Sequence, residues 1–332
     1  WSAQNDGNLC RAYKMSVTRI AIIGCGGMAS AHVSRFEGLE DRMKVAAAVD
    51  IELDKARKTA AGFPGAKAAT DYHEILDSVA AVLLVLPHHL HHRVTLDCLA
   101  AGKHVLLEKP MANSEQECLD IIDASDKSDR ILMIAYCMRF DSCIARMKEL
   151  LDARTYGKCF QMSIWTEQLT RFPKDSWGDR AETLGGGQLF SHGCHYIDLL
   201  LWFMGNPVSG SHIGTNFGTP WMEKEGTSNV SIRFESGALG YHFGTWGARG
   251  TRLHYSFHAH CTEGMLEYRL SGHEFDSERL IFHKGGKEEI LMKGEYAKPT
   301  RNEMIHFLDC IETGKEPLTN ARDSLEGLRL IW

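Results

Sequence analysis

The sequence lacks any apolar run long enough to cross a membrane, and it lacks any block of basic residues. Its most apolar helix-like stretch, residues 196–204, is far shorter than the roughly 18 residues of a membrane span, so we expect a buried helix there. The chain has 37 Lys and Arg against 43 Asp and Glu, a formal net charge of −6. These features argue against a membrane protein and against a nucleic-acid-binding protein.

Cysteine is not patterned for metal binding or redox chemistry. The 10 cysteines are scattered and no Cys-x-x-Cys pair occurs, which excludes a zinc ribbon and a thioredoxin-like motif. The simplest setting for so many unpatterned thiols is a reducing compartment, so we expect a cytoplasmic protein. The P-loop pattern G-x-x-x-x-G-K-[S/T] is also absent, which excludes that type of nucleotide site.

Length and composition suit a globular protein of two domains. The chain has 332 residues, of which 44% are hydrophobic and 24% charged, both ordinary values. Residues 1–14 are polar and lack the apolar core of a secretory signal. We expect Met15 to be the natural start and residues 1–14 to be a flexible extension or tag.

Strands alternate with helices over residues 15–137, the pattern of an α/β domain with a doubly wound parallel sheet. The continuous apolar run at 82–86 is typical of a strand buried on both faces, and a helix over 93–101 follows it. The sequence therefore predicts a Rossmann domain. Its expected strands are residues 20–23, 45–49, 82–86, 104–107 and 131–136.

Residues 138–332 show a different pattern, in which strands with alternating apolar residues follow one another across short turns. This indicates an α+β domain with a mostly antiparallel sheet, which we expect to bind substrate and to mediate oligomerisation. One long helix, residues 188–204, interrupts the strands between two glycine-containing turns. The expected strands are residues 160–167, 227–234, 239–246, 253–260 and 265–270.

A glycine-rich turn follows the first strand and opens a helix. In the sequence from Gly24 to Ala29, Gly24 permits a tight turn, Gly26 lets the backbone approach a pyrophosphate, and Ala29 lets the helix pack closely on the strand. Gly27 and Met28 lie at the helix start, where free N–H groups attract phosphate. This motif predicts a dinucleotide site.

Asp50 comes directly after the second strand, where a carboxylate can accept hydrogen bonds from an adenosine ribose. The next residue is Ile51, and no Arg stands there to meet a 2′-phosphate. The sequence therefore favours NAD(H) over NADP(H) as cofactor.

Two further loops end strands at the edge of the sheet where ligands bind. The first runs from Pro87 to His92 and the second contains Glu108 and Lys109, so we expect Pro87, His91, Glu108 and Lys109 near the nicotinamide. A partly desolvated lysine there suits proton transfer or polarisation of a substrate oxygen. The histidines at 88–92 also allow a metal site, but no Cys or carboxylate ligand lies nearby, and we predict none.

The long helix carries a second group of chemically active residues. Ser191 and His195 are four residues apart and are expected on one helix face, with His192 at its border. Imidazole titrates near neutrality, so His195 is our candidate base, with His192 and Lys109 as further catalytic groups. Ser191 and His192 are also expected to contact the substrate.

Polar and aromatic residues upstream of this helix are candidates for binding the substrate. Arg171 and Arg180 could bind a carboxylate or a diol, and Trp177 could stack on a sugar face.

The ordered set of motifs resembles the Gfo/Idh/MocA family of NAD(P)-dependent oxidoreductases. The matching segments run from the glycine-rich turn through Ala101 to Val105, Glu108-Lys109-Pro110, Arg139-Phe140 and the glycines before the long helix to Asp198. The resemblance implies a Rossmann domain followed by an open sheet, a substrate that is a sugar, polyol or cyclitol, and a homodimer or homotetramer formed through that sheet.

One residue departs from the family pattern. Family dehydrogenases commonly carry Asp where this chain has Ser191. The sequence Ser191-His192-Gly193 resembles a Thr-His-Gly sequence of NAD-dependent glycosidases, which oxidise a sugar carbon transiently, and there Tyr136 would join the acid–base groups that contact substrate. We therefore expect a sugar oxidoreductase, with a redox-neutral glycosidase or lyase as the first alternative and a non-enzymatic NAD-binding sensor as the second.

Overall fold

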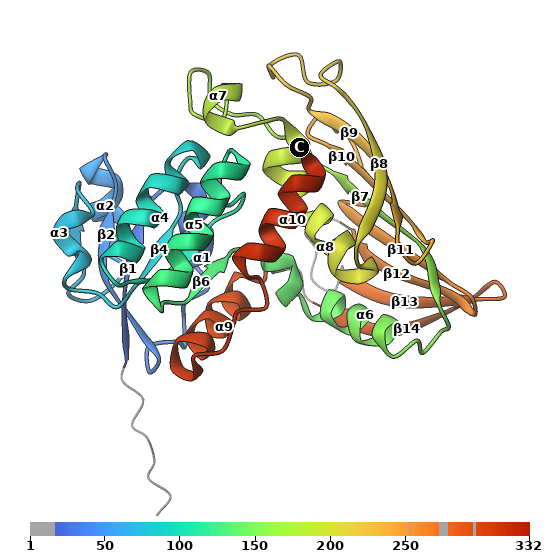
Figure 1. The fold of residues 1–332 in the computed structure, drawn as a ribbon, viewed down its shortest axis with the longest axis horizontal. Helices are drawn as coiled ribbons and strands as arrows, with labels where there is room; N and C mark the ends of the chain where they lie inside the picture. Colours follow the sequence, from blue (N-terminus) through green and yellow to red (C-terminus); the bar gives the residue numbers. More distant parts are fainter. Residues whose placement is uncertain (1–16, 252, 272–277, 295–296) are drawn as a thin grey trace, which may run out of the picture.

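The computed structural model describes residues 17–251, 253–271, 278–294 and 297–332. The expected extension at residues 1–14 lies outside these ranges. The described chain builds two sheets that lie at opposite ends of the molecule, with α8 and α10 between them (Figure 1).

The first sheet has six parallel strands in the order β3-β2-β1-β4-β5-β6. The strand order reverses between β1 and β4, and in sheets of this type the ligand binds beyond the carboxyl ends of the strands at that point. The predicted parallel sheet is confirmed. Its strands are β1 (Thr18–Ile23), β2 (Met43–Val49), β3 (Lys67–Ala69), β4 (Ala81–Leu84), β5 (His104–Leu107) and β6 (Leu132–Ile134).

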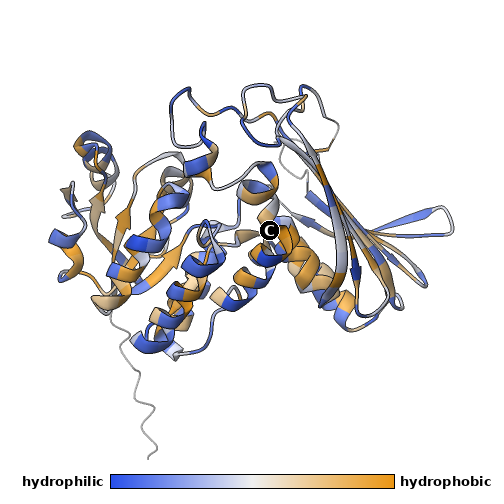
Figure 2. Cartoon of the chain, turned by 45° about the horizontal axis from the view of Figure 1, so that its top comes forward, coloured by the Kyte–Doolittle hydropathy of each residue, from blue (hydrophilic) through white to orange (hydrophobic). Residues whose placement is uncertain are grey.

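Both faces of this sheet are covered, because successive side chains on each strand point to opposite sides. Ala21 and Ile23 join the core on one face, and Ile20 and Ile22 join the core on the other. The strands of this sheet are largely hydrophobic in Figure 2. The helices of this part of the chain are α1 (Gly27–Val33), α2 (Leu53–Ala60), α3 (His73–Leu76), α4 (His91–Ala100) and α5 (Glu115–Ser128).

The second sheet has eight strands in the order β14-β13-β12-β11-β7-β10-β9-β8. All neighbouring pairs are antiparallel except β7 and β10, which are parallel. The predicted mostly antiparallel sheet is thus confirmed. Its strands are β7 (Cys159–Glu167), β8 (Pro207–Thr215), β9 (Thr227–Phe234), β10 (Leu239–Thr245), β11 (Tyr255–Cys261), β12 (Gly264–Leu270), β13 (Glu278–Lys284) and β14 (Lys287–Gly294).

One face of the second sheet packs against α6 (Ser142–Asp152) and α8 (Cys194–Met204). Ile144 and Met147 of α6 and Leu200 of α8 meet Ile164 and Phe257 of the sheet in one buried cluster. The apolar segment at 196–204 is therefore a core helix, as predicted. None of the helices in the described ranges has the length and hydrophobicity that a membrane span requires.

The predicted helix over 188–204 differs in its first turns. Residues Leu189–Gly193 form a π-helical segment, and the α-helix begins only at Cys194. A π turn holds more residues than an α turn, so a spacing of four does not place Ser191 and His195 in line as it would in a regular α-helix.

The chain returns to the first sheet at its end. Met304 and Phe307 of α9 (Thr300–Thr313) pack on the face that α1 covers, and Leu325 and Leu328 of α10 (Ala321–Ile331) pack on the opposite face. The sequence-based division assigned residues 138–332 to a second domain. In space, however, the last two helices complete the core of the first.

Candidate active site

The glycine-rich turn after β1 has the geometry that the motif predicts. Gly24 has a φ of +93°, and a Cβ atom there would lie 2.0 Å from the carbonyl oxygen of Val85, so only glycine fits. A Cβ at Gly26 or Gly27 would meet nothing within 4 Å. Ala29 is fully buried in the core under the sheet. The open space beside Gly26 and Gly27 fits a dinucleotide pyrophosphate.

Asp50 connects this turn to the end of β2. Its Oδ2 accepts a hydrogen bond from the backbone N–H of Cys25 at 2.9 Å, and its Oδ1 accepts one from the N–H of Glu52 at 2.9 Å. The carboxylate therefore lies next to the turn, as a ribose ligand should.

The two loops that follow β4 and β5 are joined by a buried histidine. The Nδ1 atom of His91 lies 2.8 Å from the carbonyl oxygen of Pro110, and its Nε2 atom lies 2.9 Å from that of Leu86. Burial lowers the pKa of His91, and a neutral ring has a single N–H, which it donates to one of these two carbonyl oxygens. Both ring nitrogens face backbone carbonyls, which makes His91 a support beneath the predicted pocket.

Glu108 forms a buried pair with His32 of α1, with 2.7 Å between Oε1 and Nε2. Burial alone would raise the pKa of Glu108, but the hydrogen bond from His32 and the charges of His32, Lys109 and Lys298 lower it to about 2. Glu108 is therefore a carboxylate directed at the protein interior. His32 was not predicted, because no local pattern marks it.

Lys109 reaches from the first sheet to the segment before α8. Its Nζ donates a hydrogen bond of 3.0 Å to the backbone carbonyl oxygen of Ser191. Lys109 and the segment at 191–195, which the sequence assigns to one site, are therefore in contact. The sequence did not reveal that the contact uses the backbone of Ser191.

His195 and His192 lie side by side at this point, with ring centroids 6.2 Å apart. His195 is 5% exposed, and its Nδ1 is buried with no hydrogen-bond partner, which leaves Nε2 as the accessible nitrogen. Burial lowers the pKa of His195 well below its ordinary value, and Lys109 and Lys298 lower it further. The ring is neutral at physiological pH, as a proton acceptor must be.

His192 contacts the side-chain amide of Gln168, the residue that follows β7. The Nε2 atom of Gln168 lies 2.7 Å from Nε2 of His192, and the hydroxyl of Tyr196 lies 3.5 Å from the same atom. Burial lowers the pKa of His192 well below the ordinary value, followed by the charges of Lys109, His242 and Lys298. Sequence reasoning missed Gln168.

The helix that carries these histidines is fixed by a buried ion pair. Arg139 donates two hydrogen bonds to Asp198 of α8, at 2.8 and 2.7 Å, and both side chains are almost fully buried. Arg139 also donates to Asp323 of α10 at 3.0 Å. The pair thus fixes α8 against the end of the first sheet, as bidentate Arg–carboxylate contacts do.

Tyr136 lies behind the site. It is buried, its hydroxyl is 3.2 Å from Oγ of Ser324 on α10, and burial raises its pKa well above the ordinary value. Its ring packs edge-on against His195, with 5.8 Å between centroids. The predicted contact of Tyr136 with substrate therefore needs revision, because the hydroxyl points to α10 and the ring supports the histidine.

The predicted substrate residues upstream of the π segment lie in an outer loop. Arg171 stacks on Trp221 at 4.3 Å, and Arg180 lies 3.8 Å from Asp175 at the surface. Trp177 packs edge-on against His88, 4.8 Å between ring centroids. The structure does not bring the two arginines to Lys109 and His195.

A second lysine enters the site from the segment before α9. The Nζ atom of Lys298 lies 3.0 Å from Sδ of Met28, in the first turn of α1. Its charge acts on the pKa of Glu108, His192 and His195. No sequence pattern marked Lys298, since it lies far along the chain from every motif.

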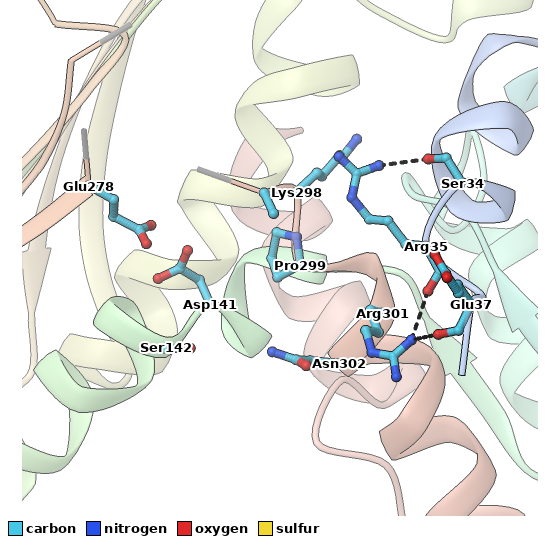
Figure 3. Close-up of a pocket in the computed structure, with 11 residues that line it drawn as sticks. Ser34, Arg35, Glu37, Asp141, Ser142, Glu278, Lys298, Pro299, Arg301 and Asn302 are labelled. Carbon is cyan, nitrogen blue, oxygen red and sulfur yellow. Dashed lines mark hydrogen bonds between the residues drawn. The ribbon is translucent and has the colours of Figure 1, made fainter. Parts of the chain in front are cut away.

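Lys298 also lines a cavity of about 420 Å³ at the junction of α1, α6 and α9. Figure 3 shows Asp141 and Glu278 facing each other on its wall. The ligand atoms of Asp141, Cys143 and Glu278 lie within 4.8 Å of one another. Tyr268 donates to Glu278 at 2.8 Å, and burial and the neighbouring Glu278 raise the pKa of Asp141 well above its ordinary value.

Comparison with known proteins identifies this architecture. Residues 18–136 match the family described as "Oxidoreductase family, NAD-binding Rossmann fold", and residues 144–267 match the "GFO/IDH/MocA C-terminal domain". The fold and the glycine-rich turn define a Rossmann domain of the NAD-binding type followed by the C-terminal domain of the same family. The chain belongs to the GFO/IDH/MocA family.

Two curated relatives illustrate the relationship. Inositol 2-dehydrogenase 2 of Saccharopolyspora erythraea is 27% identical over 225 residues, which cover 66% of this chain and 64% of that protein. The 1-carboxy-3-chloro-3,4-dihydroxycyclohexa-1,5-diene dehydrogenase of Comamonas testosteroni is 29% identical over 303 residues, 87% of this chain and 70% of that protein. The match to the first relative thus spans less than two thirds of its length.

A solved structure with the same fold is the WlbA dehydrogenase from Bordetella pertussis in complex with NADH and UDP-GlcNAcA. It superposes with a TM-score of 0.83 at 19% identity and covers 95% of this chain and 93% of that one. At this level of identity the similarity shows the fold.

Proposed function

We propose that the protein is an NAD(H)-dependent oxidoreductase that transfers a hydride between nicotinamide and a CH–OH carbon of a sugar, polyol or cyclitol derivative. The observation that carries the proposal is the contact between Lys109 Nζ and the Ser191 backbone, which brings the lysine of one domain to His192 and His195 of the other. The names of the two curated relatives, both dehydrogenases of hydroxylated rings, support this class of substrate.

The residues of this chain would handle the proton and the substrate oxygen. The bound dinucleotide supplies the hydride acceptor. Lys109 donates a hydrogen bond to the substrate hydroxyl oxygen and stabilises negative charge as it develops there. Nε2 of the neutral His195 accepts the hydroxyl proton. Ser191 and His192 orient neighbouring hydroxyl groups.

Asp50 supports NAD(H) as the preferred cofactor. Its carboxylate stands at the end of β2 and would repel a 2′-phosphate while accepting hydrogen bonds from a free ribose. Replacing Asp50 by Ala should weaken NADH binding and reduce discrimination against NADPH, measured by fluorescence titration of both cofactors. An unchanged NADH titration would contradict this placement of the ribose.

The central test is Lys109→Met. We expect kcat/KM for NADH formation on a responsive sugar or cyclitol to fall by about a thousandfold or more, because a charge-stabilising donor is lost. NADH affinity should stay within about twofold, since Lys109 is assigned to the substrate. Lys287→Met, an exposed lysine of β14, is the matched control. Activity retained in Lys109→Met would refute the assignment.

A redox-neutral glycosidase is the second candidate, favoured by Ser191 in place of a carboxylate. Such an enzyme regenerates NAD⁺ in each cycle and has no need to release it. Denaturing the purified protein and quantifying NAD⁺, NADH and NADP(H) separates the two. Near-stoichiometric NAD with product formed and no NADH accumulated favours the glycosidase; reversible binding of added NAD favours the dehydrogenase.

We also propose that the outer face of the second sheet forms a homodimer or homotetramer. Trp165 is 40% exposed and Phe160 is 54% exposed on β7, where Tyr241 and Phe243 of β10 pack beside Trp165. An exposed aromatic group of this kind marks an association surface. Light scattering should give a multiple of the chain mass, and Trp165→Lys should reduce it.

The nine described free cysteines support a reducing compartment, and we propose the cytoplasm. Cell fractionation tests this location.

A further inference from the structure

Two cysteines face each other across neighbouring strands in the middle of the second sheet. Cys159 is the first residue of β7 and Cys261 is the last residue of β11, and the two are register partners in the antiparallel pairing of these strands. Among the described residues, no other cysteine has a cysteine as its register partner. No spacing in the sequence relates the two, so the fold alone brings them together.

The backbone places this pair at a narrow position of the ladder. The N–H of Thr262 donates to the carbonyl oxygen of Lys158 at 3.0 Å, so these two residues form a hydrogen-bonded pair and the adjacent cysteine pair is a non-hydrogen-bonded one. In such pairs the Cα atoms lie about 4.5 Å apart and the side chains are closest. A disulfide spans Cα distances of roughly 4.4–6.8 Å, so the backbone already suits one.

Both side chains point to the sheet face that α6 and α8 cover. Cys159 packs at the border of the buried cluster on this face, and Cys261 alternates in step with Phe257 and Ala259, which belong to that cluster. The sulfur of Cys159 lies 3.8 Å from Sδ of Met204, the last residue of α8. Cys261 is buried and Cys159 is half-buried, so a molecule as small as hydrogen peroxide reaches the pair from the side of Cys159.

The two thiols also interact with each other. A hydrogen bond between them is the largest influence on the pKa of both, and it lowers the pKa of Cys261 and raises that of Cys159. Burial opposes the effect on Cys261 without cancelling it. The thiolate is the reactive form of cysteine, so Cys261 is the nucleophile of the pair and Cys159 is the thiol next to it.

We propose that Cys159 and Cys261 form a reversible disulfide when hydrogen peroxide reaches the protein, and that this bond covalently joins the two halves of the second sheet. Disulfides in reducing compartments are usually transient and respond to oxidants, and this pair fits that class. The proposal is independent of the oxidoreductase function.

The reaction consumes one hydrogen peroxide for each disulfide. The Cys261 thiolate attacks one peroxide oxygen, the O–O bond breaks, and a sulfenic acid forms while the departing hydroxide takes up the thiol proton to give water. The Cys159 sulfur then attacks the sulfenic sulfur, the S–O bond breaks, and the second water leaves with the proton of Cys159. Two thiols thereby lose two electrons and two protons, and the peroxide is reduced to two waters.

The position of the pair determines what the bond would do. The contact between β11 and β7 is the centre of the sheet, with four strands on each side of it (Figure 1). The register of these two strands shifts just before Cys261, so the ladder is irregular at this end. A bond here closes a loop of about 100 residues, which lowers the entropy of the unfolded chain.

The cross-link would lie far from the candidate active site. β7 runs from Cys159 to Glu167, and Gln168, which contacts His192, follows it. At about 3.3 Å per residue, the pair is roughly 25 Å from that end of the strand. Oxidation should therefore stabilise the second sheet and leave cofactor binding unchanged.

The test is peptide mapping of the full-length protein by mass spectrometry after exposure to hydrogen peroxide. The folded protein is reduced, freed of reductant and treated with peroxide, and the remaining thiols are blocked with iodoacetamide before digestion. The variants are Cys159→Ser and Cys261→Ser, with Cys310→Ser at another buried thiol, in α9, as the matched control. Thermal unfolding and NADH titration are measured on the same oxidised and reduced samples.

We expect the peptide that contains Cys159 to be joined to the peptide that contains Cys261, and dithiothreitol to separate them. The oxidised protein should melt about 5 °C above the reduced protein, because the cross-link restricts the unfolded chain. Each serine variant of the pair should lose both effects, and Cys310→Ser should keep both. Affinity for NADH should change by about twofold or less.

The proposal fails if both thiols are alkylated after peroxide treatment, if either is converted to a sulfinic acid instead, or if the two peptides are joined no more often in folded protein than in protein oxidised in urea. It also fails if the oxidised protein melts no higher than the reduced one. Should a serine variant not fold, mapping and melting of the wild type with and without dithiothreitol decide between these outcomes. None of these measurements requires turnover, so they stand apart from the test of Lys109.

Discussion

Lys109 donates a hydrogen bond from Nζ to the backbone carbonyl oxygen of Ser191, 3.0 Å away. The lysine is thus positioned by a backbone carbonyl, a group that is present whichever residue type occupies position 191. The serine side chain takes no part in this contact, so the lysine is held without a carboxylate at position 191.

The variant Ser191→Ala should therefore keep Lys109 in place. We expect kcat to change little and KM to rise about three- to tenfold, the effect of losing one hydrogen bond to substrate. Steady-state kinetics on a responsive substrate measure both values. A fall in kcat comparable to that of Lys109→Met would mean that the serine hydroxyl, and not the carbonyl, controls the lysine.

Gly24 and Gly26 should respond differently to alanine. Gly24→Ala forces a Cβ against the Val85 carbonyl at a positive φ, so we expect a loss of roughly 2 kcal/mol or more of unfolding free energy. Gly26→Ala meets no protein atom and should keep its melting temperature, while NADH affinity drops about tenfold because the methyl group occupies the pyrophosphate space. Equal NADH affinity in Gly26→Ala and wild type would exclude this loop as the phosphate site.

The pH profile of oxidation should extend to unusually acidic pH. Burial and the nearby lysines lower the pKa of His195 well below 6.5, so the neutral base persists as the pH falls through that value. The acidic limb of kcat/KM should lie below pH 6.5, and His195→Gln should abolish turnover while NADH still binds. A limb at or above pH 6.5 would show that another group supplies the base.

His242 makes the fold sensitive to acid. It is fully buried, and burial lowers its pKa from 6.5 to about 4, against the hydrogen bond to the Ile164 carbonyl. Between these values the unfolded chain binds a proton that the native protein does not, so stability is complete above pH 6.5 and falls as the pH drops toward 4.

From pH 7 to pH 5 this residue should cost about 2 kcal/mol of unfolding free energy. Urea unfolding at the two pH values, in the wild type and in His242→Asn, measures it. The asparagine variant should lose less stability on acidification; an identical loss would place the acid sensitivity elsewhere.

Removing only one partner of the ion pair between Arg139 and Asp198 should lower the free energy of unfolding strongly. Arg139→Met leaves a buried carboxylate without its partner, and we expect a loss of about 3–5 kcal/mol. The double variant Arg139→Met with Asp198→Leu should recover much of this loss, because no buried charge remains. Chemical denaturation of the wild type and these two variants gives the values, and a double variant less stable than the single one would contradict this account.

The features that could be predicted from the sequence are those that depend on a short stretch of consecutive residues. The glycine-rich turn, the position of Asp50 after β2 and the strand ahead of Lys109 each depend on local pattern and on the rule that ligands bind at the carboxyl edge of a parallel sheet. These were sufficient to place Lys109 with the histidines of the second domain.

Other features depend on contacts between distant parts of the chain. Lys298 meets Met28, and Tyr136 turns its hydroxyl to Ser324, although no spacing in the sequence relates these pairs. The π segment at Leu189–Gly193 is also unmarked, because its residues suit an α-helix equally well. Strands β8, β13 and β14 of the second sheet were missed. β8 and β14 lie at the sheet edges and are largely exposed, so their apolar alternation is weak.

The return of α9 and α10 to the first sheet also constrains biosynthesis. As the chain leaves the ribosome, the parallel sheet emerges first, yet both of its apolar faces stay incompletely covered until the second sheet has been synthesised and the last two helices arrive. Until then the N-terminal half of the nascent chain keeps exposed hydrophobic surface, and chaperones bind surface of this kind. Completion of the domain built on the first sheet is in this way tied to synthesis of the domain built on the second.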